Sequence, residues 1–238
     1  MASPNIRLNN TSHESGEATG FDIGTNSSLH AHRDDDHFDI CFVRNLRERK
    51  HNILYTFFYS GLRIRNPPDI TDVYAVAELT TQDGRGAGPE IIIGKNQRGV
   101  IHAEKDLINK LRSFFDTSPR IVNIKTWINF SPCRRCSEKL LSFFQEKSMY
   151  INSRTIVFPS LYRIHEPRNV VGLKFFELSG ISLSTFSEAD WVKLRQLLYV
   201  SREDSIFPPV DTAARTGQDQ RNASRLRHLM ITQIDLQQ

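Results

Sequence analysis

The segment HAEKDLINKLRSFFDTSPRIVNIKTWINFSPCRRC, residues 102–136, contains a helix pattern, a strand pattern and the start of a second helix pattern. Apolar residues recur at helical spacing from Leu107 to Phe115 and stop before Pro119. Residues 121–130 are rich in β-branched and aromatic side chains, which predicts a buried strand. Helical spacing returns over 132–147. A strand between two helices is typical of α/β folds with partly parallel pairing.

Strand and helix patterns also alternate on both sides of this segment. Alternating apolar residues predict a strand at 73–81, three consecutive isoleucines predict another at 90–94, and the Gly-rich residues 82–89 predict a hairpin between them. The further predicted elements are a helix at 47–60, a strand at 155–161, a helix at 168–178, a strand at 181–186 and a helix at 188–200.

The C-terminal region contains a predicted break and a last helix. Pro208 and Pro209 are predicted to interrupt the chain before a helix near residues 222–236. Four apolar side chains of this helix are expected to dock on the rest of the protein: Leu226, Leu229, Met230 and Ile234.

The N-terminal residues and the rest of the sequence carry opposite net charges. Residues 1–36 are polar and hold two arginines and six acidic residues, a net charge of −4, so the remaining residues carry +8 to reach the net charge of +4. We expect residues 1–36 to form a disordered acidic tail, because they contain few large apolar groups to bury. The basic remainder favours polyanionic partners, although a solvated basic surface is the simpler alternative.

The cysteines and the hydropathy pattern narrow the class of protein. Three cysteines among 238 residues, Cys41, Cys133 and Cys136, are too few for a disulfide framework, so a reducing compartment is expected. No apolar stretch approaches the ~20 residues of a membrane helix, and the N-terminal residues lack the pattern of a signal peptide. We therefore expect a protein of the nucleus and/or cytoplasm, with no membrane association and no obligate protein partner.

Three side chains of the quoted segment form a candidate metal site, and a fourth, Glu104, lies beside them in the sequence. His102 opens one predicted helix, and Cys133 and Cys136 open the next, where the positive end of the helix dipole favours thiolates. Three protein ligands would leave one position of a tetrahedral Zn²⁺ open, as in catalytic sites, and Glu104 lies close enough in sequence to transfer protons there. A purely structural zinc site is the alternative, but it needs a fourth ligand and leaves Glu104 without a role. His-x-Glu followed by Pro-Cys-x-x-Cys is the signature of zinc-dependent nucleobase deaminases.

Over residues 47–200 the sequence resembles the AID/APOBEC-like polynucleotide cytidine deaminases, which include the lamprey cytidine deaminases. Phe130 stands where the family's Ser-Trp-Ser-Pro-Cys motif has its tryptophan, and Ser131 stands where tRNA adenosine deaminases have Glu before Pro-Cys, which favours cytosine over adenine. The further agreements are Ser160-Leu161-Tyr162, which is similar to the family's Arg-Leu-Tyr, then Gly172-Leu173 and Ser179-Gly180-Ile181.

The resemblance implies a cytidine deaminase-like α/β fold, with a central five-stranded mixed sheet, parallel last strands and about six flanking helices. Residues 37–204 would form the catalytic domain, and 205–238 a linker and a helix packed on it. The implied reaction is hydrolytic conversion of cytosine to uracil in single-stranded DNA, with RNA as the less favoured substrate. The residues implied to hold Zn²⁺ are His102, Cys133 and Cys136, and Glu104 is implied to be the catalytic proton shuttle.

The substrate-binding residues predicted from the resemblance and from their chemistry surround the same motifs. Tyr162 is implied to contact the target base and Asn96 the sugar beside it, and Trp127 and Phe130 are further aromatic candidates for stacking. The remaining substrate-binding candidates are Ala103, Ser131 and Arg163, and the candidates for nucleic-acid contacts are Arg63, Arg65, His165 and Arg168.

Two other classes of function remain open from the sequence. One is a deaminase of free nucleotides or tRNA, and the other is a catalytically inactive nucleic-acid-binding protein stabilised by zinc. Antiviral or immune mutagenesis is the biological context that the family suggests.

Overall fold

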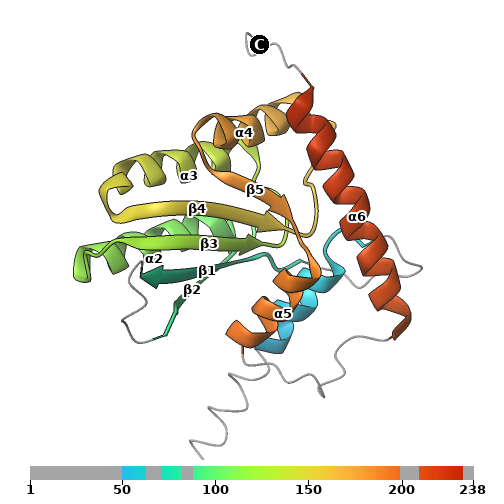
Figure 1. The fold of residues 1–238 in the computed structure, drawn as a ribbon, viewed down its shortest axis with the longest axis horizontal. Coiled ribbons are helices and arrows are strands. Elements are labelled where there is room, and N and C mark those ends of the chain that lie inside the picture. Colours follow the sequence, from blue (N-terminus) through green and yellow to red (C-terminus); the bar gives the residue numbers. More distant parts are fainter. Residues whose placement is uncertain (1–49, 63–70, 82–87, 199–208, 233–238) are drawn as a thin grey trace, which may run out of the picture. The chain divides into compact units, whose positions relative to one another are not determined.

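A five-stranded mixed sheet forms the centre of the fold (Figure 1), in the order β2-β1-β3-β4-β5. The antiparallel part consists of β1 (Tyr74–Thr81), which pairs with both β2 (Glu90–Lys95) and β3 (Val122–Ile128). The parallel part consists of β3, β4 (Ile151–Phe158) and β5 (Ser182–Thr185). The predicted α/β class, mixed sheet and parallel last strands are confirmed.

The computed structural model describes residues 50–62, 71–81, 88–198 and 209–232, all within one compact unit, Cys41–Gln238. The predicted tail, 1–36, lies outside the described residues, and so do Cys41, Arg63 and Arg65. The division of the chain at residues 204 and 205 stays a prediction.

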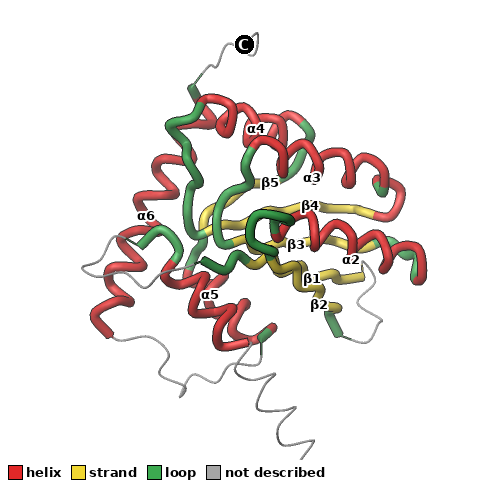
Figure 2. The backbone as a smooth tube through the Cα atoms, turned by 180° about the vertical axis from the view of Figure 1, so that it is seen from behind, coloured by secondary structure: helices red, strands yellow, loops and turns green. Residues whose placement is uncertain are grey.

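Helices cover both faces of the sheet (Figures 1 and 2). On one face, α2 (Ala103–Thr117), α3 (Arg134–Glu146) and α4 (Pro167–Leu178) pack against one set of strand side chains. On the other face, a helix at residues 50–59 and α5 (Glu188–Leu197) pack against the alternate set. None of the described helices combines the length and the apolar character that crossing a membrane requires.

The last helix, α6 (Pro209–Ile231), begins thirteen residues before the predicted start. Proline is compatible with the first turn of a helix because its missing N–H has no partner there. The first half of α6 buries polar instead of apolar side chains, so it lacks the pattern that predicts an amphipathic helix. Leu226 is buried in the core and Met230 packs against it, whereas Ile234 lies outside the described residues.

One strand also differs from its prediction. β4 begins at Ile151 instead of residue 155, directly after the 3₁₀ helix η1 (Ser148–Tyr150). The polar residues 152–155 are exposed or half-buried, so apolar content alone marks only the second half of this strand.

Candidate active site

The predicted metal ligands lie at the N-termini of two neighbouring helices. His102 is the N-cap of α2, Cys133 is the N-cap of α3, and Cys136 lies in the first turn of α3. Neither N-cap side chain makes a capping hydrogen bond. These side chains therefore remain available to bind a ligand, in the positive potential of two helix N-termini.

The three ligand atoms have the spacing that a tetrahedral zinc site requires. His102 Nδ1 lies 3.3 Å from Cys136 Sγ and 3.9 Å from Cys133 Sγ, and all three atoms lie within 4.8 Å of one another. Zn–S and Zn–N bonds of about 2.3 and 2.1 Å at tetrahedral angles separate ligand atoms by about 3.6 Å. In the described part of the chain, this is the only His, Cys or carboxylate cluster close enough to share an ion. The residues fit Zn²⁺ with three protein ligands, the number typical of catalytic sites.

The two thiols differ in their acidity because they share a hydrogen bond. A hydrogen bond from Cys136 lowers the pKa of Cys133 to about 5, and backbone N–H groups at the start of α3 contribute to this. The same hydrogen bond raises the pKa of Cys136. Zn²⁺ binds cysteines as thiolates, so metal binding releases the proton that Cys136 holds.

Glu104 lies next to this cluster without belonging to it. Its side chain is buried and lines the same pocket as His102 and Cys133. Burial raises the pKa of Glu104, so this carboxyl group titrates closer to neutral pH than an exposed glutamate does. A carboxyl group in this environment suits proton transfer.

Two glycines allow these helix starts to approach their neighbours closely. A Cβ atom on Gly94 of β2 would lie 2.7 Å from the backbone nitrogen of Leu107, against the first turns of α2. A Cβ atom on Gly172 of α4 would lie 3.1 Å from the Cα atom of Arg134, the first residue of α3. Only glycine permits both contacts without moving the helices that carry the ligands.

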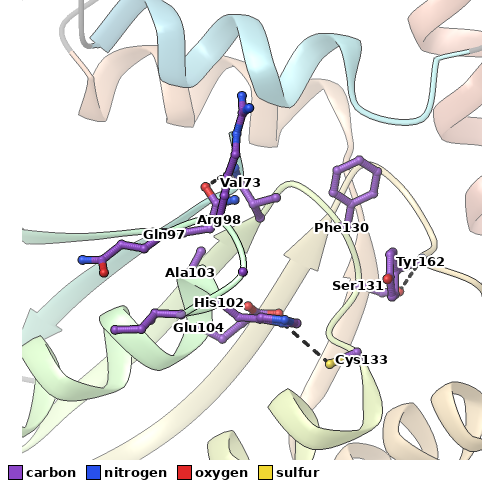
Figure 3. A pocket seen from close by; sticks show the side chains of 13 residues that line it. Val73, Gln97, Arg98, His102, Ala103, Glu104, Phe130, Ser131, Cys133 and Tyr162 are labelled. Atoms are coloured by element: carbon purple, nitrogen blue, oxygen red, sulfur yellow. Dashed lines mark hydrogen bonds between the residues drawn. The ribbon is translucent and has the colours of Figure 1, made fainter. Parts of the chain in front are cut away.

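Two of the three ligands, His102 and Cys133, line a pocket of about 200 Å³ (Figure 3). Because a cavity of about 150 Å³ accommodates benzene, this pocket is large enough for one six-membered ring. The Phe130 and Tyr162 rings meet edge to face in its wall, with centroids 6.4 Å apart. The lining residues are Val73, Asn96, Gln97, Arg98, Gly99, Ile101, His102, Ala103, Glu104, Phe130, Ser131, Cys133 and Tyr162.

Hydrogen bonds fix two polar residues of the pocket wall. The side-chain carbonyl of Asn96 accepts the N–H of Val73 at 2.8 Å, and its amide donates to the Thr71 carbonyl at 3.2 Å. Ser131 Oγ accepts the N–H of Tyr162 at 2.8 Å. Ser131 therefore links the segment before α3 to the segment that carries Tyr162.

Trp127 lies in the core and not in the pocket wall, which corrects the expectation that it contacts substrate. Its side chain is fully buried among the residues that face α5, and its indole N–H donates to Asp190 at 3.2 Å. Successive residues of a strand point to opposite faces, and Trp127 faces the side of the sheet away from α2 and α3.

Among the predicted basic contacts, the described residues Arg163, His165 and Arg168 lie outside the pocket lining. Arg163 is exposed at a positive φ of 41°, with its guanidinium 5.3 Å from the Tyr162 ring centroid. Arg163 and Arg168 both pair with Glu166, at 3.4 and 2.8 Å. His165 is exposed in the same segment. These side chains lie close to Tyr162 in the chain, and the Arg163 guanidinium lies over the ring of Tyr162, which lines the pocket.

Sequence reasoning missed Arg98, an exposed residue that lines the pocket opposite the aromatic pair. It lies in the connection between Asn96 and His102, two residues that were predicted to belong to the site. A positive residue between two candidate site residues is the signal that identifies it.

The sheet order, the flanking helices and the His-Cys-Cys cluster define a fold and site of the cytidine deaminase class. The sequence model of the APOBEC3H family matches residues 70–196, more than half of the chain, and the protein belongs to this family of APOBEC cytidine deaminases. None of the curated proteins compared with the chain matches it. The matched range contains the candidate ligands and Glu104, and it ends before α6.

Proposed function

We propose that this protein is a zinc-dependent enzyme that deaminates cytosine to uracil in single-stranded polynucleotide, with DNA favoured over RNA. One observation carries the proposal: His102, Cys133 and Cys136 converge beside the buried Glu104, in a pocket that accommodates one base. Membership of an APOBEC cytidine deaminase family supports the reaction.

The residues divide the chemistry between them. His102, Cys133 and Cys136 would hold Zn²⁺, which when bound supplies the Lewis acidity that activates a water molecule for hydrolysis. Glu104 would accept a proton from that water and deliver it to N3 of cytosine. It would then transfer the remaining proton of the hydroxyl group added at C4 to the leaving amino group. One water is consumed, the C4–N bond breaks, and ammonia and uracil are the products.

The pocket wall orients the base. Phe130 and Tyr162 offer aromatic surface to an unstacked pyrimidine, and stacking of this kind contributes ~1–3 kcal/mol per base. Phe130 keeps an aromatic face where the resembling motif has tryptophan, but it lacks the indole N–H. The orientation of the base therefore rests on its contacts with Tyr162 and the backbone, and Asn96 would hold the sugar beside it.

A polynucleotide substrate fits the positive charges around the pocket. Arg98 lines the pocket, and Arg163 and Arg168 are exposed in the segment that follows Tyr162, where phosphates of a bound strand would pass. The net charge of +8 outside the first 36 residues favours a polyanion. The same proposal includes immune or antiviral mutagenesis of nucleic acid, in the nucleus and/or cytoplasm.

The test uses zinc-loaded full-length protein and single-stranded oligonucleotides that contain one cytosine. Uracil in DNA is detected by uracil glycosylase and strand cleavage, and parallel reactions with RNA, tRNA and free cytidine are analysed by mass spectrometry. Glu104→Gln should retain zinc and fold but lose about 10²–10⁴-fold in rate, because it removes the proton-transferring group. If the zinc-loaded wild-type protein binds oligonucleotides without forming uracil, it is an inactive binding protein. If it deaminates only free cytidine or tRNA, the proposed substrate class, single-stranded polynucleotide, is wrong.

A further inference from the structure

Helix α6 buries a charged side chain against Pro159, three residues before the pocket residue Tyr162. The Arg215 side chain is only 2% exposed. The helix that carries it, α6, lies outside the residues matched by the family model. Its Nη1 donates to the carbonyls of Phe58 and Ser60 at 3.1 and 2.9 Å. Its Nη2 donates to the Pro159 carbonyl at 2.9 Å and to Asp219 at 2.7 Å. A planar guanidinium can satisfy this fixed set of acceptors, whereas a single ammonium cannot.

A second α6 side chain binds the same carbonyl. Asn222 is buried, and its amide donates to the Pro159 carbonyl at 2.7 Å. Both lone pairs of the Pro159 carbonyl are therefore used by α6. The start of the connection between β4 and α4 is held by two side chains of one helix.

This connection leads directly to the pocket. Three residues after Pro159, Tyr162 lines the pocket and donates its N–H to Ser131 Oγ. The Ser160 carbonyl accepts the N–H of Ser131 at 2.8 Å. Residues 159–162 are thus fixed to α6 at one end and to the segment before α3 at the other.

The opposite side of Arg215 reaches the end of the helix at 50–59. Phe58 and Ser60 supply its carbonyl acceptors there, and the next residue, Gly61, adopts a φ of +66°. A Cβ atom on Gly61 would lie 2.8 Å from the Cβ atom of Ser160. Arg215 therefore binds two chain segments at the point where they touch.

We propose that Arg215, together with Asn222, is a positioning residue: α6 fixes Pro159 against the end of the helix at 50–59 and thereby sets the place of Tyr162 in the pocket wall. The expected effect on deamination rests on the proposed function, whereas the expected effect on the position of Tyr162 does not. A role in stability alone predicts that these variants unfold more easily but keep a normal pocket while folded.

The experiment compares full-length Asn222→Leu and Arg215→Lys with Leu226→Ala. Leu226 lies on the same helix and is buried in the core, so its truncation destabilises α6 without removing a hydrogen bond to Pro159. Asn222→Leu removes one donor and leaves Arg215 in place, which keeps the comparison informative if Arg215→Lys folds poorly. Hydrogen exchange of the peptide containing residues 159–163 is measured by mass spectrometry under conditions where circular dichroism shows each protein folded.

We expect amide exchange in residues 160–163 to become about tenfold faster in Asn222→Leu and Arg215→Lys and to stay unchanged in Leu226→Ala. The KM for a single-stranded oligonucleotide should rise about tenfold in the first two variants, with a smaller change in kcat, because stacking on Tyr162 is weakened. Wild-type exchange in Asn222→Leu, or equal acceleration in Leu226→Ala, overturns the proposal. Exchange that changes as expected in a protein that deaminates nothing supports the positioning role and rejects only the proposed function.

Discussion

Replacing Gly94 with alanine is expected to displace the first turns of α2, and with them His102 and Glu104. The new Cβ atom would lie 2.7 Å from Leu107 N and 2.8 Å from Leu107 Cβ. The carbonyl oxygen of Ala103, at the start of α2, would lie closer still. Ordinary contacts between such atoms begin near 3.4 Å, so α2 or β2 must move by at least about 0.7 Å. Backbone atoms cannot relieve this contact by changing a rotamer.

Two magnitudes follow from that displacement. Overpacking of this kind costs about 1–3 kcal/mol in the free energy of unfolding. A shift of about 1 Å in catalytic geometry lowers rates by about 100-fold, so a loss of about 10- to 100-fold in kcat/KM is expected. Zinc affinity should fall as well, because His102 moves relative to the two cysteines.

The assay combines urea unfolding, zinc stoichiometry and deamination of a single-stranded oligonucleotide. Gly180→Ala is the matched control, because Gly180 adopts a φ of +70° and no heavy atom of the described residues lies within 4 Å of its Cβ position. Backbone strain should destabilise this control by about 1 kcal/mol without changing the activity of the folded protein. If Gly94→Ala keeps wild-type zinc affinity and kcat/KM, close packing against β2 does not set the position of the ligands.

Three further predictions address charge and metal. Asp190→Asn should lower the free energy of unfolding by about 1–2 kcal/mol at pH 7. Burial alone would raise the pKa of Asp190, but hydrogen bonds from Lys125 and Ser187 bring it below 3.8. The stabilisation is therefore present above pH 3.8 and disappears as the pH falls below it, and a difference that persists at acid pH in urea titrations contradicts this. Arg98→Ala should weaken oligonucleotide binding and reduce the slope of log K against log salt by about 0.7. An unchanged slope would show that Arg98 makes no phosphate contact. Chelation should lower the Tm and abolish deamination, with recovery on adding Zn²⁺ but not Mg²⁺, because the ligands are two sulfurs and an imidazole; an unchanged Tm after complete metal removal argues against the site.

The parts of the fold with regular apolar spacing could be predicted from the sequence. The helix α2 lies where the helical pattern places it, because one apolar face of it is buried in the core. The strands β1 and β2 also lie where the sequence predicts them, and their alternate residues pack against the clusters on the two opposite faces of the sheet. The start of α6 could not be found in this way, since Arg215 and Asn222 occupy its buried face. Hydrogen bonds to distant carbonyls stabilise that face, and they leave no local periodic signal.

The candidate ligands could be predicted because their spacing is local to two helix starts, whereas the pocket wall depends on tertiary arrangement. Trp127 and Phe130 are three residues apart and both aromatic, yet only Phe130 reaches the pocket. The difference arises because Trp127 is still in β3 and faces α5, while Phe130 follows the end of the strand. The place where a strand ends decides which aromatic side chain lines the pocket, and composition does not show that place.

Two of the candidate ligands occupy helix N-cap positions, where the residues that bind the metal are not the residues that best stabilise the helix. Ser, Asp or Asn at the positions of His102 and Cys133 would cap α2 and α3 and stabilise each helix by about 1 kcal/mol. Selection for a more stable chain alone would therefore remove the metal site. A lineage that no longer needed the chemistry would be expected to lose these two residues early, and their retention in a relative is a sign that its site is still in use.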